Sequence, residues 1–210
     1  IIQNRGYFMF ESIKAGGILM IPILLSGVFS IFIIIERCYY FAVIKKRDKR
    51  LMYGINSSLK AGNYEAAAVA CSEADTPTSQ VVKKAIDCRR WEEKDLKESV
   101  EAEMNLVVPK FEHLISTLGT ISSIATLLGL LGTVTGNIKA FGVLGGGGAM
   151  GDPALLANSI AEALVTTVAG LCVSIPSMIF HNFFVSRVNH SIVEMETNVT
   201  SVLLMLAGRI

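Results

Sequence analysis

Hydrophobic residues along this chain gather into three long stretches that contain no Asp, Glu, Lys or Arg. They run from residue 16 to 35, from 114 to 138 and from 163 to 186, which is 20, 25 and 24 residues. A helix needs about 20 apolar residues to cross the hydrocarbon core of a membrane, and helices buried in soluble proteins seldom run so long without a charge. The pattern therefore predicts an all-α integral membrane protein with three transmembrane helices.

The segment between the first two stretches also has a helical pattern. Residues 55–75 are rich in Ala and predict one short helix. Thr76 directly precedes Pro77, and this order favours an N-cap followed by proline at the first helical position. A second short helix is therefore expected from Pro77 to about Arg90.

The second and third helices are predicted to extend far beyond the membrane. Asp95 and Glu98 have the spacing of a capping box, and a continuous helix is expected from Asp95 to Phe141, kinked at Pro109. Its 47 residues would be about 70 Å long.

The third helix is expected to start at Asp152-Pro153 or Asn158 and to meet no helix breaker before Gly208. After residue 187 its apolar residues recur at steps of three and four, which predicts a helix-packing seam. The seam consists of Val188, Ile192, Met195, Val199, Val202 and Leu206.

Basic residues are distributed unevenly, and this asymmetry predicts the topology. Fourteen of the 19 Lys and Arg residues lie between Arg37 and Lys110. Basic loops stay in the cytoplasm, so residues 37–113 are expected there, with Glu36 and Arg37 as an anchor at the membrane edge and the cluster from Lys45 to Arg50 near lipid headgroups. The predicted order is a periplasmic segment 1–15, first span 16–36, cytoplasmic helical domain 37–113, second span 114–138, periplasmic loop and start of the third helix 139–162, third span 163–186 and cytoplasmic C-terminal helix 187–210.

Composition excludes several other classes of function. Only 18% of the residues are charged and the net charge is +1, which argues against a nucleic-acid partner. Four Cys without a C-x-x-C pair and three His favour neither a metal site nor a disulfide scaffold. The glycines Gly146, Gly148 and Gly151 have G-x-G-x-x-G spacing, but no strand precedes them and no acidic residue follows at the required distance. We therefore expect no enzyme activity and no cofactor.

Small and polar residues form one face on each of the last two spans. On the second span the face also overlaps the close-packing motif Gly132-x-x-x-Gly136. The two faces consist of Gly119, Ser122, Thr126, Gly129, Thr133 and Gly136, and of Glu162, Thr166, Gly170, Ser174, Ser177 and His181, with Thr167 beside the second set. Close packing accounts for Gly129, Gly132, Gly136 and Gly170. The hydroxyls of Thr126, Thr133, Thr166, Thr167 and Ser174 either face a pore or partner or bond to their own helix backbone, and both interpretations stay open.

Glu162 is the one carboxylate that borders these faces. An ionisable group near membrane depth is costly, by roughly 2.5–3.5 kcal/mol, and is a functional candidate for that reason. The alternative is a solvated residue at the outer membrane edge.

Three blocks of the sequence resemble a known family. Residues Pro22 to Phe41 ("PILLSGVFSIFIIIERCYYF") are similar to the first span of ExbB and TolQ proteins. Residues Leu127 to Phe141 ("LLGLLGTVTGNIKAF") and Leu156 to Phe184 are similar to the second and third spans of the MotA/TolQ/ExbB proton-channel superfamily. Three spans favour the ExbB/TolQ branch.

The resemblance implies a motor subunit of the bacterial inner membrane, with a periplasmic N-terminus and a cytoplasmic C-terminus. Such proteins form a pentamer around a dimer of a single-span ExbD/TolR-type partner with a membrane-embedded Asp, and use the proton motive force to drive a TonB-like or outer-membrane-linked protein. By motif position Thr133 and Thr167 correspond to pore-lining threonines and Glu162 to the acid at the start of the third span. The alternative is a non-conducting scaffold protein of the same fold.

Overall fold

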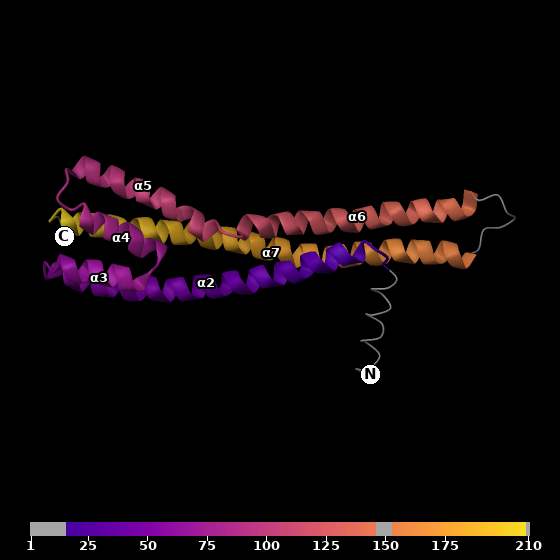
Figure 1. Ribbon diagram of the computed structural model, residues 1–210, viewed down its shortest axis with the longest axis horizontal. Coiled ribbons are helices and arrows are strands. Elements are labelled where there is room, and N and C mark those ends of the chain that lie inside the picture. The colour runs from indigo at the N-terminus through magenta and orange to yellow at the C-terminus, as the bar shows by residue number, and fades with distance from the viewer. Residues whose placement is uncertain (1–15, 146–152, 209–210) are drawn as a thin grey trace, which may run out of the picture. The chain divides into compact units, whose positions relative to one another are not determined.

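The computed structural model describes residues 16–145 and 153–208, and all regular structure in these ranges is α-helical (Figure 1). The helices are α2 (Met20–Lys60), α3 (Tyr64–Ala74), α4 (Pro77–Asp87), α5 (Glu93–Glu112), α6 (Ile115–Gly145) and α7 (Pro153–Leu206). Three stretches are long and apolar enough to cross a membrane, namely Met20–Lys60, Glu93–Gly145 and Pro153–Leu206. The prediction of an all-α protein with three transmembrane helices is confirmed. The predicted segment 1–15 and the glycine motif at 146–151 lie outside the described residues.

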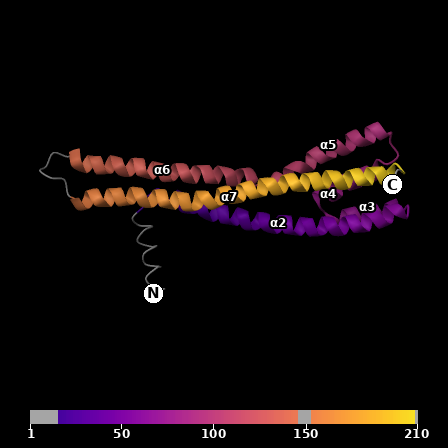
Figure 2. The same cartoon turned by 180° about the vertical axis from the view of Figure 1, so that it is seen from behind.

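The chain divides into two compact units, and the first contains the start of α2, the whole of α6 and α7 up to residue 182. In it α6 lies alongside the first half of α7, as both views show (Figures 1 and 2). The buried face of α6 is made mostly of small residues at steps of three and four, which let two helix backbones approach closely. It consists of Ile115, Leu118, Ser122, Ala125, Gly129, Gly132, Gly136 and Ala140.

The second unit comprises residues 35–114 and 183–208 within the described range. Here α4 packs against both α3 and α5. Thr76 caps α4 in a reciprocal capping box with Ser79, and Pro77 is the first helical residue, as the sequence predicts. The predicted seam of α7 is buried at Val188, Met195, Val199 and Val202, which lose their apolar surface to the core of this unit.

The continuous helix expected from Asp95 to Phe141 is wrong, because the chain breaks between α5 and α6. Pro109 lies inside α5 without ending it, and the helix stops at Glu112. Leu114 has φ 62°, a left-handed conformation that no α-helix can continue through. The capping box expected at Asp95 is also absent. Instead α5 begins at Glu93, and its N-cap has no side-chain hydrogen bond.

The short helix expected over residues 55–75 is only partly correct. Residues 55–60 belong to the long helix α2, which ends at Lys60. Gly62 then has φ 69°, and the Asn63 side chain accepts a hydrogen bond from the Ala66 amide, so α3 starts at Tyr64. The turn follows from glycine's tolerance of positive φ and from the Asn cap. At the far end α7 stops at Leu206, just before Gly208 with φ 67°.

Asp48 joins α2 to the start of α4 within the second unit. Its two carboxylate oxygens accept hydrogen bonds from Thr76 Oγ1 (2.5 Å) and Thr78 Oγ1 (2.7 Å). Burial raises the pKa of Asp48 above its usual value and Glu194 adds to the rise, while the two hydroxyls oppose it. Because the folded pKa lies above the unfolded one, the ionised form weakens the fold at neutral pH, and this penalty disappears as pH falls through the folded pKa.

We therefore expect acidification below neutral pH to stabilise the wild type more than an Asp48→Asn variant, which cannot ionise at this position. The measurement is the thermal unfolding midpoint of both proteins in detergent between pH 7 and pH 4. The difference, wild type minus variant, should rise as pH falls. A difference that falls instead would mean that the threonine hydroxyls outweigh burial and lower this pKa.

Candidate functional site

The closest approach of α6 and α7 is made by glycines. A Cβ atom on Gly170 would lie 2.6 Å from the carbonyl oxygen of Ala125 and 3.0 Å from the Cα of Gly129. A Cβ on Gly136 would lie 2.5 Å from the Cβ of Ala163. These positions have no room for a side chain, so the two backbones pack directly against each other.

Two of the candidate threonines differ in how their hydroxyls are used. Thr167 Oγ1 donates across the interface to the carbonyl of Gly129 (2.9 Å) and also contacts the carbonyl of Ala163 in its own helix (3.2 Å). Thr133 is half-buried, and its Oγ1 donates to the carbonyl of Leu130 in its own helix (2.6 Å). The structure thus places Thr167 in the α6–α7 contact and Thr133 at its margin.

Further along the same two helices three hydroxyls form a cluster. Ser122 Oγ donates to the carbonyl of Ser174 (2.9 Å), and Thr126 Oγ1 donates to Ser174 Oγ (2.6 Å). Ser174 and Ser122 are buried, whereas Thr126 is exposed at the edge of the interface. This cluster brings together two of the candidates, Thr126 and Ser174, and satisfies polar groups that have no water in a membrane.

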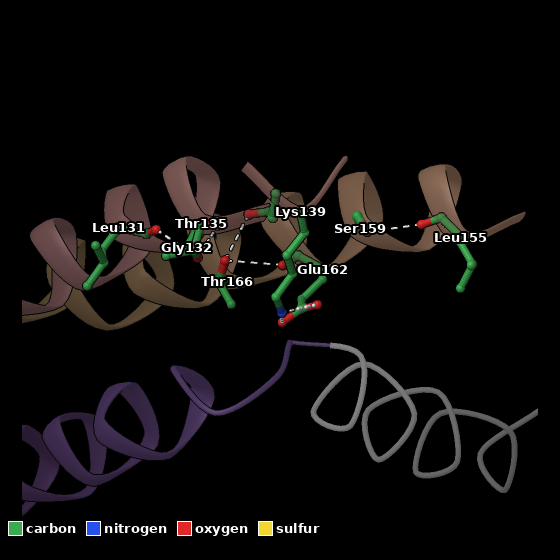
Figure 3. Close-up of polar contacts among 9 residues, drawn as sticks. Leu131, Gly132, Thr135, Lys139, Leu155, Ser159, Glu162 and Thr166 are labelled. Atoms are coloured by element: carbon green, nitrogen blue, oxygen red, sulfur yellow. Dashed lines mark hydrogen bonds and ion pairs between the residues drawn. The ribbon is translucent and has the colours of Figure 1, made fainter. Parts of the chain in front are cut away.

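Thr166 occupies a packing position. It is 1% exposed, and its side chain fills the space where a Cβ on Gly132 would lie. Its Oγ1 donates to the backbone carbonyls of Glu162 and Ala163 (Figure 3). Every hydrogen bond printed by this geometry is satisfied inside α7, so Thr166 offers no free surface in this unit.

Glu162 forms an ion pair with Lys139, which the sequence analysis did not predict. The Lys139 ammonium lies 2.7 Å from Glu162 Oε1 and 2.9 Å from Oε2, and the two side chains point at each other from α6 and α7 (Figure 3). Gly17, just before α2, has φ 63°, and a Cβ atom there would overlap the Glu162 carboxylate. Glycine is therefore required at Gly17 both by its backbone conformation and by this close approach.

His181 lies at the other end of this helix pair. Its Nδ1 is 2.9 Å from the carbonyl oxygen of Ile115, the first residue of α6, and its ring fills the space beside Gly119. Glu162 and His181 are 19 residues apart on α7, or roughly 28 Å along the axis. The polar side chains that α6 and α7 offer between them are hydroxyls and thiols, which hold no charge near neutral pH.

The predicted anchor at Glu36 and Arg37 lies in the second unit. Arg37 donates from Nε and Nη2 to the two carboxylate oxygens of Glu36 (2.5 and 2.7 Å) and stacks over the ring of Tyr40, 4.3 Å from its centroid. Arg37 is 3% exposed. The pair therefore neutralises a charge that the protein itself covers.

Within residues 16–145 and 153–208 no three His, Cys, Asp or Glu side chains gather as a metal site would need. The chemistry that this unit offers is therefore that of hydroxyls, backbone carbonyls and one ion pair.

Comparison with known proteins points to one family. The sequence profile of the MotA/TolQ/ExbB proton channel family matches residues 73–197, which is more than half of the chain. An ExbB-like biopolymer transport protein of Synechocystis sp. is 29% identical over 171 residues, which cover 81% of each chain. The biopolymer transport protein ExbB of Neisseria gonorrhoeae is 32% identical over 52% of this chain and 56% of its own. The Tol-Pal system protein TolQ of Haemophilus influenzae is 36% identical over 41% of this chain and 37% of its own.

Proposed function

The chain belongs to the MotA/TolQ/ExbB proton channel family, and from this membership and the geometry of α6 and α7 we propose that it is a proton-channel subunit that works with a single-span partner of the ExbD/TolR type. It is a multi-pass membrane protein and not an enzyme. The partner, the assembly and the driven process belong to the proposal.

The observation that carries the proposal is the chemistry between Glu162 and His181. Over roughly 28 Å of α7 the hydroxyls of Thr167, Ser174 and Thr126 can orient water, but none of them takes up and releases a proton near neutral pH. A proton path along this face therefore needs a titratable group from outside the chain. An Asp carried on a partner's transmembrane helix would supply it, beside Thr133 and Thr167.

The energy available is sufficient for such a device. One elementary charge that crosses a membrane potential of 100 mV releases about 2.3 kcal/mol. We propose that five copies of this chain surround a dimer of the partner, that the complex lies in the bacterial inner membrane, and that proton flow drives an outer-membrane-linked process. The topology in this proposal has the N-terminus in the periplasm and the C-terminus in the cytoplasm, as the basic residues of 37–113 favour.

The test is reconstitution of the purified chain in liposomes with an imposed potential, with and without the single-span protein that co-purifies with it. The chain alone should acidify the lumen only at the background rate, and the complex should conduct. A partner variant with its intramembrane Asp changed to Asn is the control and should return flux to background. Equal flux from the chain alone and from the complex would refute the need for a partner carboxylate. No flux from the complete complex would favour the alternative, a non-conducting scaffold of the same fold.

A further inference from the structure

The ion pair between Lys139 and Glu162 joins the only two charged side chains of the described helix pair. Residues 115–145 contain one charged residue, Lys139, and residues 153–186 contain one, Glu162. They lie on different helices and 23 positions apart, yet the ammonium contacts both carboxylate oxygens at 2.7 and 2.9 Å. The start of α2, residues 16–34, adds no charge to this unit.

The surroundings of the carboxylate leave Lys139 as its sole ionic partner among the described residues. On one side the Gly17 backbone approaches so closely that a Cβ atom would overlap the carboxylate. On its own helix the nearest polar contact, from Thr166 Oγ1, goes to the Glu162 backbone carbonyl rather than to its side chain. The other ionisable group of the helix pair, His181, lies at the opposite end of α7.

The exposures of the two side chains show which of them is free to move. The Glu162 side chain is 27% exposed, whereas the Lys139 side chain is 55% exposed. Lysine carries a compact charge on a flexible four-carbon stem, and an ion pair with a partly exposed lysine gains little energy. Lys139 can therefore leave the carboxylate by rotating into solvent, while Glu162 stays in place between α7 and Gly17.

We propose that Lys139 is a positioning residue for Glu162: it keeps the carboxylate ionised and occupied, and Glu162 accepts a proton only when the ammonium swings away. In this exchange the carboxylate takes the proton from water at the membrane surface, and Lys139 keeps its own proton throughout. The site passes from net charge zero to +1 and returns to zero when the proton moves on. The part of Glu162 in proton transfer rests on the proposed function, but its ion pair with Lys139 does not.

Three variants separate the charge of Lys139 from its bulk. Lys139→Met keeps the length of the aliphatic chain and removes the charge, whereas Lys139→Arg keeps the charge and is the matched control. Glu162→Gln removes the titrating group. A nearby opposite charge lowers the pKa of a carboxyl group by about 1–3 units, and partial exposure favours the lower end of this range.

The experiment is an infrared titration of the full chain in liposomes, which follows the protonated-carboxyl band that is lost in Glu162→Gln. Lys139→Met should move the midpoint of this band upward by about 1 pH unit relative to wild type. Lys139→Arg should stay within a few tenths of a unit of the wild type. An unchanged midpoint in Lys139→Met would overturn the proposal, because the ammonium would then have no influence on Glu162.

A second measurement links the pair to conduction. In the complex with the co-purifying partner, the pH of half-maximal flux should shift upward in Lys139→Met and remain near the wild-type value in Lys139→Arg. A conducting Lys139→Met complex with an unshifted pH profile contradicts the proposal. If the wild-type complex does not conduct, the proposed function fails, but the infrared titration still decides whether Lys139 controls the protonation of Glu162.

Discussion

A single methyl group on Gly170 is expected to destabilise the protein. The Cβ atom of Gly170→Ala would lie 2.6 Å from the Ala125 carbonyl and 3.0 Å from the Gly129 Cα. Both neighbours are backbone atoms, so they cannot rotate away, and α6 and α7 must separate. Overpacking of this kind costs about 1–3 kcal/mol. In an unconstrained helix the same change would gain about 1 kcal/mol, so the sign of the effect is diagnostic.

Gly142→Ala is the matched control, because Gly142 also lies within a helix of the same unit and a Cβ there meets nothing within 4 Å. The thermal unfolding midpoint of the purified protein should fall for Gly170→Ala and stay level or rise for Gly142→Ala. Equal midpoints for the two variants would show that the helices are not in backbone contact at Gly170 in the membrane.

The helices could be predicted where local chemistry fixes them. A charge-free stretch of 20 residues predicts a span from its own composition, and Thr76-Pro77 specifies a helix start from two adjacent residues. The break before α6 could not be found in this way. Leu114 adopts φ 62° without being glycine, and no residue around it signals that conformation, whereas Pro109 is tolerated inside α5. The outcome depends on tertiary packing that a local pattern does not contain.

The ion pair at Glu162 illustrates what periodicity leaves undetermined. Steps of three and four residues assign side chains to a face of a helix, but they do not fix the axial register of two helices. Lys139 and Glu162 meet because Gly129 packs against Gly170 and Gly136 against Ala163, which sets the level of α6 against α7. A usable signal was present in the sequence, since each helix offers one charge of opposite sign near the same predicted membrane edge.

The polar face predicted on the second span is shifted by part of a turn in the structure. Steps of three and four give a mean period of 3.5, and a straight helix has 3.6 residues per turn, so the line of residues drifts around the helix. Ser122, Gly129 and Gly136 lie inside the contact with α7, whereas Thr126 and Thr133 lie at its edge. The edge position leaves these two threonines able to face a further helix.

That position leads to the prediction with the largest functional effect. Thr133→Val and Thr167→Val keep the side-chain volume and remove the hydroxyl. If these hydroxyls orient the water that carries protons to a partner carboxylate, flux in the reconstituted complex should drop about tenfold or more, which corresponds to roughly 1.4 kcal/mol on the barrier. The measurement is the proton flux of each variant complex at a fixed imposed potential, normalised to the amount of assembled complex.

Packing and conduction can be told apart because the two threonines use their hydroxyls differently. Thr133 Oγ1 bonds only to the Leu130 carbonyl of its own helix, so Thr133→Val removes no interhelical contact of this chain. Thr167→Val removes the bond to the Gly129 carbonyl, and such a bond contributes about 0.6 kcal/mol in a membrane protein, too little to prevent assembly. Thr167→Ser keeps the hydroxyl and should conduct.

Thr135→Val is the control on the same helix, since Thr135 Oγ1 also bonds only to its own backbone, at Leu131 and Gly132, and lies on a different side of α6 from Thr133. It should conduct like the wild type. If Thr133→Val and Thr135→Val both conduct normally, a hydroxyl at Thr133 is needed only for its own helix and the water path does not pass there. If Thr133→Val alone loses flux while its complex assembles, the loss cannot come from packing inside this chain, because no other helix of the chain bonds to that hydroxyl. The affected step must then lie between Thr133 and a group that another chain supplies.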